Sequence, residues 1–247
     1  MANWNEPRPD LTGYGASPSL DGRTAARAGY DTGLRRHMLS IYNYMASGVL
    51  LSGIVALLTA QSGMAQALMG TPLRWLFILS PLVIVFAMSF GANRFSTGTL
   101  KALFWVFATL MGVSMSTIFL VYTGGSIAAT FFATAGAFAG LSLFGYTTKK
   151  DLTGFGSFLI MGVVGLLIAS LLNIWLQSPG LYWAVSFLGV LIFAGLTAYD
   201  TQRLKMEYYQ LQGTDFAGKA VILGALSLYL DFINMFQFLL SFMGNRE

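Results

Sequence analysis

The chain has 247 residues, of which 55% are hydrophobic and only 10% are charged, and its mean hydropathy is +0.65. A soluble domain carries about 25% charged residues, so this composition excludes an ordinary soluble protein and predicts one that lies in a lipid bilayer. The absence of cysteine excludes disulfides, thiol nucleophiles and thiolate metal sites.

The N-terminal segment differs from the rest of the chain. Residues 1–38 are rich in Gly, Pro, Asp and Arg and contain no apolar core. They therefore lack the apolar region of a secretory signal, and their composition is typical of disorder. We predict two regions, a disordered cytoplasmic tail at 1–38 and a transmembrane domain at 39–247.

Seven apolar stretches follow the tail, and each approaches the ~20 residues that a membrane-spanning helix needs. Lipid offers backbone groups no hydrogen-bond partners, so only helices and closed barrels cross it. The stretches do not alternate as barrel strands do, and the predicted fold is an all-α membrane protein with seven transmembrane helices. They cover residues 39–60, 75–93, 102–123, 125–146, 155–176, 181–202 and 220–243.

The basic residues indicate how the helices are oriented. Twelve of the fourteen lie in the tail or in the connections after the second, fourth and sixth stretches, and only Arg74 and Arg246 lie on the other side. The positive-inside rule then predicts a cytoplasmic N-terminus and an external C-terminus. The net charge of +4 is explained by orientation, and we expect no nucleic-acid partner.

Small residues and loop lengths suggest how the helices pack. The links on the external side are short, so neighbouring helices are expected to form antiparallel hairpins, and the longest connection is predicted at 203–218. The fourth stretch has small residues at spacings of three and four, which predict close helix packing. These residues are Ala133, Gly136, Ala137 and Gly140.

Asp200 and Asp231 are the only acidic residues within or at the edge of an apolar stretch. A carboxylate at the centre of a membrane helix costs roughly 2.5–3.5 kcal/mol on insertion scales. Acidic residues are retained in such places mainly for function. The two aspartates are therefore the predicted functional site.

Polar residues of the seventh stretch share one helix face. At 100° per residue, about a third of the circumference holds Gly224, Ser227, Asp231, Asn234 and Ser241. That face should point into the bundle, which places the last helix at the centre. On the sixth stretch, Thr197 and Asp200 lie in a comparable arc. We predict that Ser227, Asn234 and Thr197 support the two aspartates.

The depth of the two carboxyls decides whether they meet. Asp200 lies near the cytoplasmic boundary, about nineteen residues after the start of the sixth stretch at Leu181. Asp231 reaches the same depth if the seventh helix begins near Gly224. A start at Lys219 places Asp231 nearer the midplane, and contact then requires a tilted helix.

Two carboxyls in contact would share one proton and titrate as a coupled pair. The singly protonated pair would hold the two helices together, whereas full ionisation would drive them apart. Arg94, at the cytoplasmic end of the second helix, is predicted to be the cation beside them. The only histidine, His37, is at the membrane edge, so we expect neither a proton relay nor a metal cluster from it.

Two sequence blocks resemble the transmembrane Bax inhibitor motif family. They are Ala198-Tyr199-Asp200-Thr201-Gln202 and the run from Ala225 to Phe236, and the resemblance extends from about residue 39 to the C-terminus. It implies a central last helix and a two-aspartate pH sensor that controls calcium leak, with Asp200 and Asp231 at the sensor positions and Arg94 as their partner. Together with the short loops, it predicts a bacterial-type multi-pass protein of the inner (plasma) membrane.

We therefore predict a pH-sensitive calcium leak channel or cation/proton exchanger, with calcium ions, protons and lipid as partners and with neither enzymatic activity nor a cofactor. Two carboxylates, here Asp200 and Asp231, suit a hard cation that prefers oxygen ligands, and equally suit protons alone. One alternative is a non-transporting regulator that binds other membrane proteins. Another is an intramembrane aspartyl protease, which is disfavoured because Asp231 follows Leu228-Tyr229-Leu230 and not a Gly-x-Gly motif.

Overall fold

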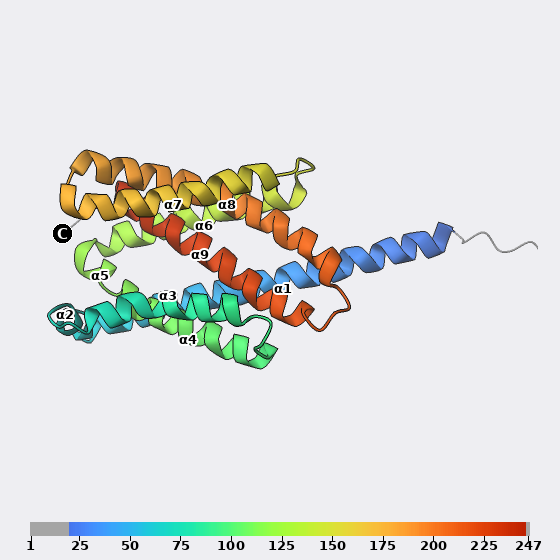
Figure 1. Ribbon diagram of the computed structural model, residues 1–247, viewed down its shortest axis with the longest axis horizontal. Helices are drawn as coiled ribbons and strands as arrows, with labels where there is room; N and C mark the ends of the chain where they lie inside the picture. Colours follow the sequence, from blue (N-terminus) through green and yellow to red (C-terminus); the bar gives the residue numbers. More distant parts are fainter. Residues whose placement is uncertain (1–19, 246–247) are drawn as a thin grey trace, which may run out of the picture. The chain divides into compact units, whose positions relative to one another are not determined.

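The computed structural model describes residues 20–245, except for the side chains of residues 20–31 and 69. Helices make up most of this part of the chain (Figure 1). In chain order they are α1 Leu20–Gln61, α2 Met64–Met69, α3 Arg74–Gly91, α4 Thr97–Met115, α5 Ile118–Val121, α6 Gly124–Thr147, α7 Thr153–Leu176, α8 Pro179–Leu211 and α9 Ala217–Met243.

Seven helical segments of the described chain are long and apolar enough to cross a membrane. The third of them combines α4 and α5, and the first begins within α1. The predicted all-α fold with seven spans is confirmed. The spans are Thr32–Gln61, Arg74–Gly91, Thr97–Val121, Gly124–Thr147, Thr153–Leu176, Pro179–Leu211 and Ala217–Met243.

Helix α1 begins at Leu20, well before the boundary predicted near residue 39. Residues 20–38 contain no proline, which would interrupt a helix. They contain three alanines and four arginines, and both residue types favour helix. The chain divides into two compact units, 1–36 and 37–247, and the bundle described below is the second unit. The disorder predicted for residues 1–19 falls outside the described residues.

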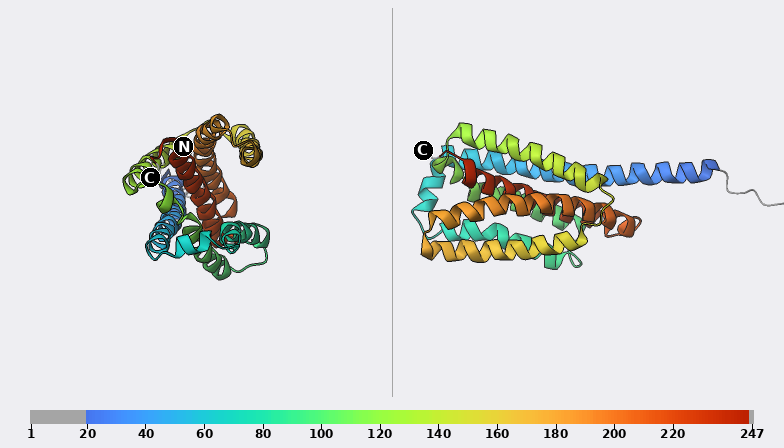
Figure 2. Two further views of the ribbon diagram at one scale, coloured as in Figure 1. Left: turned by 90° about the vertical axis from the view of Figure 1, so that its left-hand side faces the viewer. Right: turned by 90° about the horizontal axis from the view of Figure 1, so that it is seen from above.

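Helix α9 lies at the centre of the bundle, as predicted. In its apolar window 61% of the residues are buried, whereas no other span exceeds 33%. It contacts α3, α4, α6 and α8, and it runs obliquely between them (Figures 1 and 2). A central helix is shielded from lipid, which is where a chain can place polar residues at the lowest cost.

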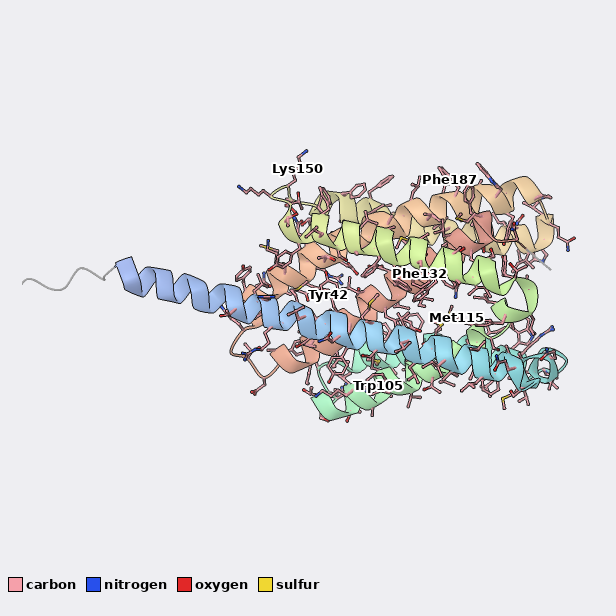
Figure 3. The ribbon with its side chains drawn as sticks, turned by 180° about the vertical axis from the view of Figure 1, so that it is seen from behind. Tyr42, Trp105, Met115, Phe132, Lys150 and Phe187 are labelled. Atoms are coloured by element: carbon pink, nitrogen blue, oxygen red, sulfur yellow. The ribbon has the colours of Figure 1, made fainter. Side chains whose placement is uncertain are left out.

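The two ends of the bundle differ in chemistry. One end, hereafter the basic end, holds the turns that connect α3 to α4, α6 to α7 and α8 to α9, and Figure 3 shows Lys150 pointing away from the ribbons there. Its basic side chains include Arg94, Lys149, Lys150 and Lys219. At the other end, exposed tryptophans begin or end helices, as in the aromatic belts of membrane proteins. They are Trp75, Trp175 and Trp183.

The small residues of α6 do not pack against other helices. Ala133, Gly136, Ala137 and Gly140 are all exposed, and a Cβ atom added at Gly136 or Gly140 would meet nothing within 4 Å. The prediction of close packing through these residues was wrong, because α6 packs on its neighbours through its opposite face. That buried face consists of Thr130, Thr134, Phe138, Ser142 and Gly145.

Gly145 makes the close approach that the exposed glycines do not. A Cβ atom there would overlap the backbone carbonyl of Ala198 on α8. We expect Gly145→Ala to lower the free energy of unfolding by about 1–3 kcal/mol, because backbone atoms must move apart. Gly140→Ala on the same helix is the matched control and should be neutral or stabilising by up to ~1 kcal/mol. Thermal unfolding in mild detergent compares them, and equal melting temperatures would contradict the expectation.

Candidate functional site

Helix α8 is longer than predicted, and its length positions the site. It continues to Leu211, where the sequence predicted an end at residue 202, and the turn that follows contains Gly213 at φ 80°. The extension is rich in Leu, Lys, Met, Glu and Gln, which favour helix, and glycine in the left-handed region is a common helix terminator. Most of the predicted connection at 203–218 is therefore helix.

The extension also explains why the two aspartates share a depth. Asp200 lies eleven residues before the end of α8, and Asp231 lies fourteen residues after the start of α9 at Ala217. At 1.5 Å per residue these positions are about 16 Å and about 21 Å from the basic end. Of the two alternatives for the seventh helix, the structure has the early start, at Ala217, and not the late start near Gly224. Helix α9 runs obliquely, as contact between the carboxyls then requires (Figure 1).

Asp200 and Asp231 form a buried carboxyl pair. Their exposed fractions are 6% and 5%, and each carboxyl acts on the other. Ser227, one turn before Asp231 on α9, donates to Asp200 on α8 and so joins the two helices beside the pair. Two ionised carboxylates side by side repel each other, so the pair is a candidate for sharing one proton.

Ser227 and Arg203 complete the surroundings of Asp200. The Ser227 hydroxyl donates a short hydrogen bond to Oδ2 of Asp200. Nη2 of Arg203 lies 3.3 Å from Oδ1 of the same carboxyl and donates to Ser227 Oγ at 3.1 Å. Asp200 thus has a partner on each oxygen, and Ser227 is one of them.

Arg203 also approaches a second acid. Its Nε lies 3.4 Å from Oε1 of Glu207, one helical turn closer to the basic end. Its guanidinium carbon lies 5.8 Å from the ring centroid of Tyr199. The positive charge acts on Asp200, Asp231 and Glu207. The carboxyl pair is therefore the inner part of a charge cluster that continues toward the basic end.

Oδ2 of Asp231 is buried and has no hydrogen-bond partner among the described residues. A buried oxygen without a partner is costly, and the cost is far higher for an ionised carboxylate than for a neutral one. The other carboxyl, Asp200, is held by an arginine and a hydroxyl. The arrangement is therefore asymmetric, with the charge stabilised on the Asp200 side.

Three predicted residues do not reach the pair. Arg94 is exposed in the turn after α3, and no ion pair joins it to either aspartate in the described structure. Thr197 is fully buried but donates to the carbonyl of Phe193 on its own helix, at 2.8 Å. Asn234 likewise donates to the carbonyl of Leu230, at 2.8 Å. Their predicted roles stay predictions.

The residues next to Asp200 fix α8 in place. The Thr201 hydroxyl lies 3.4 Å from that of Ser142 on α6 and 3.5 Å from that of Tyr42 on α1. The Gln202 amide accepts from the Leu152 backbone N–H at 2.8 Å and donates to the Lys150 carbonyl at 2.7 Å. The two residues after Asp200 in the Tyr-Asp-Thr-Gln block therefore tie α8 to α1, α6 and the turn before α7.

Two cavities adjoin α9. The first, of about 400 Å³, lies at the basic end, where α9 contributes Ala220, Leu223 and Gly224 and α8 contributes Arg203 and Glu207. The second, of about 540 Å³, lies among α3, α4, α5 and α9, and its polar lining includes Ser114, Asn234, Gln237 and Ser241. The basic-end cavity is the one that reaches the charge cluster, because Arg203 lines it and pairs with Asp200.

The carboxyl pair has few ligands for a metal ion. Within the described residues, no group of three or more His, Cys, Asp or Glu side chains could hold one. Calcium takes six to eight oxygen ligands, so two carboxyls would supply only part of a shell.

Arg203 and Glu207 are the site residues that the sequence reasoning missed. The signal was present, because spacings of three and four residues place Asp200, Arg203 and Glu207 on one helix face. It was hidden by the assignment of residues 203–218 to a connection. Hydropathy marks where a helix leaves the apolar layer, and a helix that continues beyond that layer has no apolar signal.

Together these features define a multi-pass α-helical membrane protein with a buried pair of carboxyls inside its bundle. The chain belongs to the family described as "Inhibitor of apoptosis-promoting Bax1", whose model matches residues 34–247. The resemblance inferred from the two sequence blocks is confirmed.

Bacterial relatives support the same assignment. An uncharacterised protein of Caulobacter vibrioides is 50% identical over 95% of this chain and 98% of its own length. The inner membrane protein YbhL of Escherichia coli K12 is 46% identical over 87% of this chain and 94% of its own. An uncharacterised membrane protein of Streptococcus pyogenes is 33% identical over 88% of this chain and 96% of its own. The similarity therefore spans the whole bundle.

Proposed function

We propose that the protein is a pH-sensitive calcium leak pathway of the inner (plasma) membrane, gated by the carboxyl pair of Asp200 and Asp231. The location follows the name of the E. coli relative, and the positive-inside rule places the basic end in the cytoplasm. Calcium as the ion rests on the family resemblance and on the preference of hard cations for oxygen ligands. The proposal assigns no catalytic step and no cofactor.

The observation that carries the proposal is the pair of buried carboxyls on neighbouring spans, which act on each other beside the hydrogen bond from Ser227 on α9 to Asp200 on α8. Such a pair is expensive in lipid and has no packing role that apolar side chains could not fill. Its protonation changes the force between α8 and α9. A proton equilibrium is thereby coupled to the separation of two helices.

In the holding state the pair carries one proton. Asp231 donates it to Asp200, which keeps its charge beside Arg203 and Ser227; this assignment suits the unpartnered oxygen of Asp231. Loss of the shared proton leaves two negative charges in contact, which repel. A second proton neutralises Asp200 and removes its ion pair with Arg203. Both changes loosen the contact, so flux should be lowest at the pH of the singly protonated pair.

The basic-end cavity gives a cation an approach to this contact. Arg203 and Glu207 line the cavity, and Arg203 pairs with Asp200. Separation of α8 from α9 at the pair would extend this cavity deeper into the bundle. The carboxyl pair would then be the barrier at the inner end of the basic-end cavity.

Calcium flux in liposomes that contain only the purified protein tests the proposal. The expected result is entry of calcium with a minimum at one pH and an increase on each side of it, above protein-free liposomes at every pH. Folded protein that gives no flux at any pH would overturn the proposal. That result would favour the non-transporting regulator.

A further inference from the structure

Arg203 has the geometry of a cation shared between two acids. Nη2 approaches Asp200 at 3.3 Å, and Nε approaches Glu207 at 3.4 Å. Nε is buried and forms no directed hydrogen bond within the described structure, so the contact with Glu207 is an ion pair only. The side chains of Arg203 and Glu207 are 36% and 40% exposed, whereas that of Asp200 is 8% exposed. One guanidinium therefore connects a buried acid to a solvated one.

The other charged and titratable groups nearby have different partners. Lys205 donates to the carbonyl of Tyr146 on α6, and Lys219 donates to the carbonyl of Ala92 after α3. The ring of His37 on α1 packs on Tyr208, with centroids 5.1 Å apart. Arg94 is exposed in its turn. In the part of the chain that the structure describes, the groups that face Arg203 are Asp200 and Glu207 on α8, Asp231 on α9 and the ring of Tyr199.

We propose that Arg203 is the positioning residue of the carboxyl pair, and that Glu207 sets the pH response by drawing the charge of Arg203 toward the basic end. This inference rests on the proposed gating by Asp200 and Asp231, and it adds the two residues that tune it. Glu207 itself lies outside the pair and acts on it through Arg203.

The direction of each effect follows from charge. A cation beside a carboxylate favours its ionised form. Arg203 therefore promotes loss of the shared proton, and a variant without this cation keeps the proton to higher pH. Glu207 holds part of that positive charge away from Asp200, so its neutralisation strengthens the pull of Arg203 on the pair. The pair then loses its proton at lower pH.

Both residues line the basic-end cavity, which gives the arrangement a second consequence. The guanidinium lies between this cavity and the carboxyl pair, so it repels a cation that approaches from the basic end. Movement of Arg203 toward Glu207 would weaken that repulsion. The same displacement thus alters both the proton equilibrium and the entry of the ion.

Infrared titration of the carboxyl groups in the purified, lipid-embedded protein tests the inference without reliance on flux. The reference is the midpoint at which wild type loses the shared proton, identified as the band that Asp231→Asn removes. Arg203→Gln should raise this midpoint by about one to three pH units. Glu207→Gln should lower it by about half a unit to one unit, because its charge is farther away and partly solvated.

A double variant and two controls separate positioning from general damage. If Glu207 acts through Arg203, Glu207→Gln should shift the midpoint much less in the Arg203→Gln background. Arg203→Lys should recover part of the shift, because it restores the charge without the fork that spans two acids. Lys205→Gln, two residues further on the same helix, should leave the midpoint unchanged.

Equal midpoints in wild type and both single variants, or shifts of the same sign, would overturn the inference. If Arg203→Gln does not fold, Glu207→Gln decides alone through its sign, and an upward or absent shift counts against the inference. The proposed function fails differently, through folded wild type that transports no calcium. An infrared result can stand in that case, so the two failures are distinguishable.

Discussion

Asp231→Asn is expected to abolish the alkaline increase in calcium flux. The asparagine amide can donate a hydrogen bond to Asp200 as a protonated carboxyl does, but it has no proton to lose in this range. The variant should therefore stay in the holding state where wild type opens. Below the midpoint of a single-proton step, the ionised fraction changes about tenfold per pH unit, and the wild-type flux should follow it. The flux of the variant should change less than about twofold over the same pH interval.

The measurement is calcium flux in liposomes at several pH values, with equal amounts of folded wild type and variant. Asp215→Asn is the matched control, because Asp215 is exposed in the turn between α8 and α9. It removes one carboxylate at the same end of the bundle and should leave the pH profile unchanged. Retention of the full pH response in Asp231→Asn would exclude the carboxyl pair as the sensor.

Asp200→Asn should behave differently from Asp231→Asn, although the chemical change is the same. Asp200 accepts from Ser227 and pairs with Arg203, so its neutralisation leaves the half-buried Arg203 without its inner partner. Because Arg203 is 36% exposed and keeps its contact with Glu207, solvent screens the loss, which should be about 1–2 kcal/mol and below that for a fully buried pair. We expect raised flux at all pH values and lower thermal stability. This contrast follows from the asymmetry of the pair.

The sequence predicted the fold because the bilayer restricts the choices so strongly. Seven apolar runs of spanning length permit few structures other than seven helices, and a polar face on the last run has a low-cost location only inside the bundle. The two aspartates were identifiable for the same reason, as costly groups in an apolar setting. Each of these inferences depends only on the cost of placing polar groups in lipid and needs no knowledge of tertiary contacts.

The parts that were missed depend on tertiary contacts. Arg203 and Glu207 lie on a helix that continues beyond the apolar layer, where hydropathy carries no information. The small residues of α6 satisfied a packing pattern, yet Gly145 makes the close contact with α8 and Gly140 faces away from it. A spacing pattern shows which residues share one face of a helix. It does not show which face packs against a neighbouring helix when both faces are apolar.

Tyr229→Ala is expected to be among the most destabilising single substitutions in the bundle, lowering the free energy of unfolding by about 3–5 kcal/mol. Tyr229 is fully buried, two residues before Asp231 and therefore on the opposite face of α9. Its ring lies edge-to-face on Phe107 and Phe104 of α4, with centroids 4.9 and 6.3 Å apart. Lipid is as apolar as the protein interior, so these packing contacts supply most of the stability here.

The hydroxyl of Tyr229 contributes separately from its ring. It lies 2.6 Å from Oγ of Ser52 on α1, and Ser52 in turn lies 2.7 Å from the carbonyl oxygen of Ala108 on α4. Tyr229→Phe keeps the ring contacts and should cost about 1 kcal/mol. Ser52→Ala leaves the phenol without a partner in a dry interior and should cost about 1–3 kcal/mol.

Unfolding in mild detergent measures these differences, and Tyr209→Ala is the control because Tyr209 is 44% exposed on α8. The Ser52→Ala/Tyr229→Phe double variant should be less destabilised than the sum of its single changes, since the second removes a group that the first left unpaired. Equal losses for Tyr229→Ala and Tyr209→Ala would contradict the expectation. A stable Tyr229 face would matter for the proposed gating, because it anchors α9 to α1 and α4. The contact between α8 and α9 would then be the one that protons loosen.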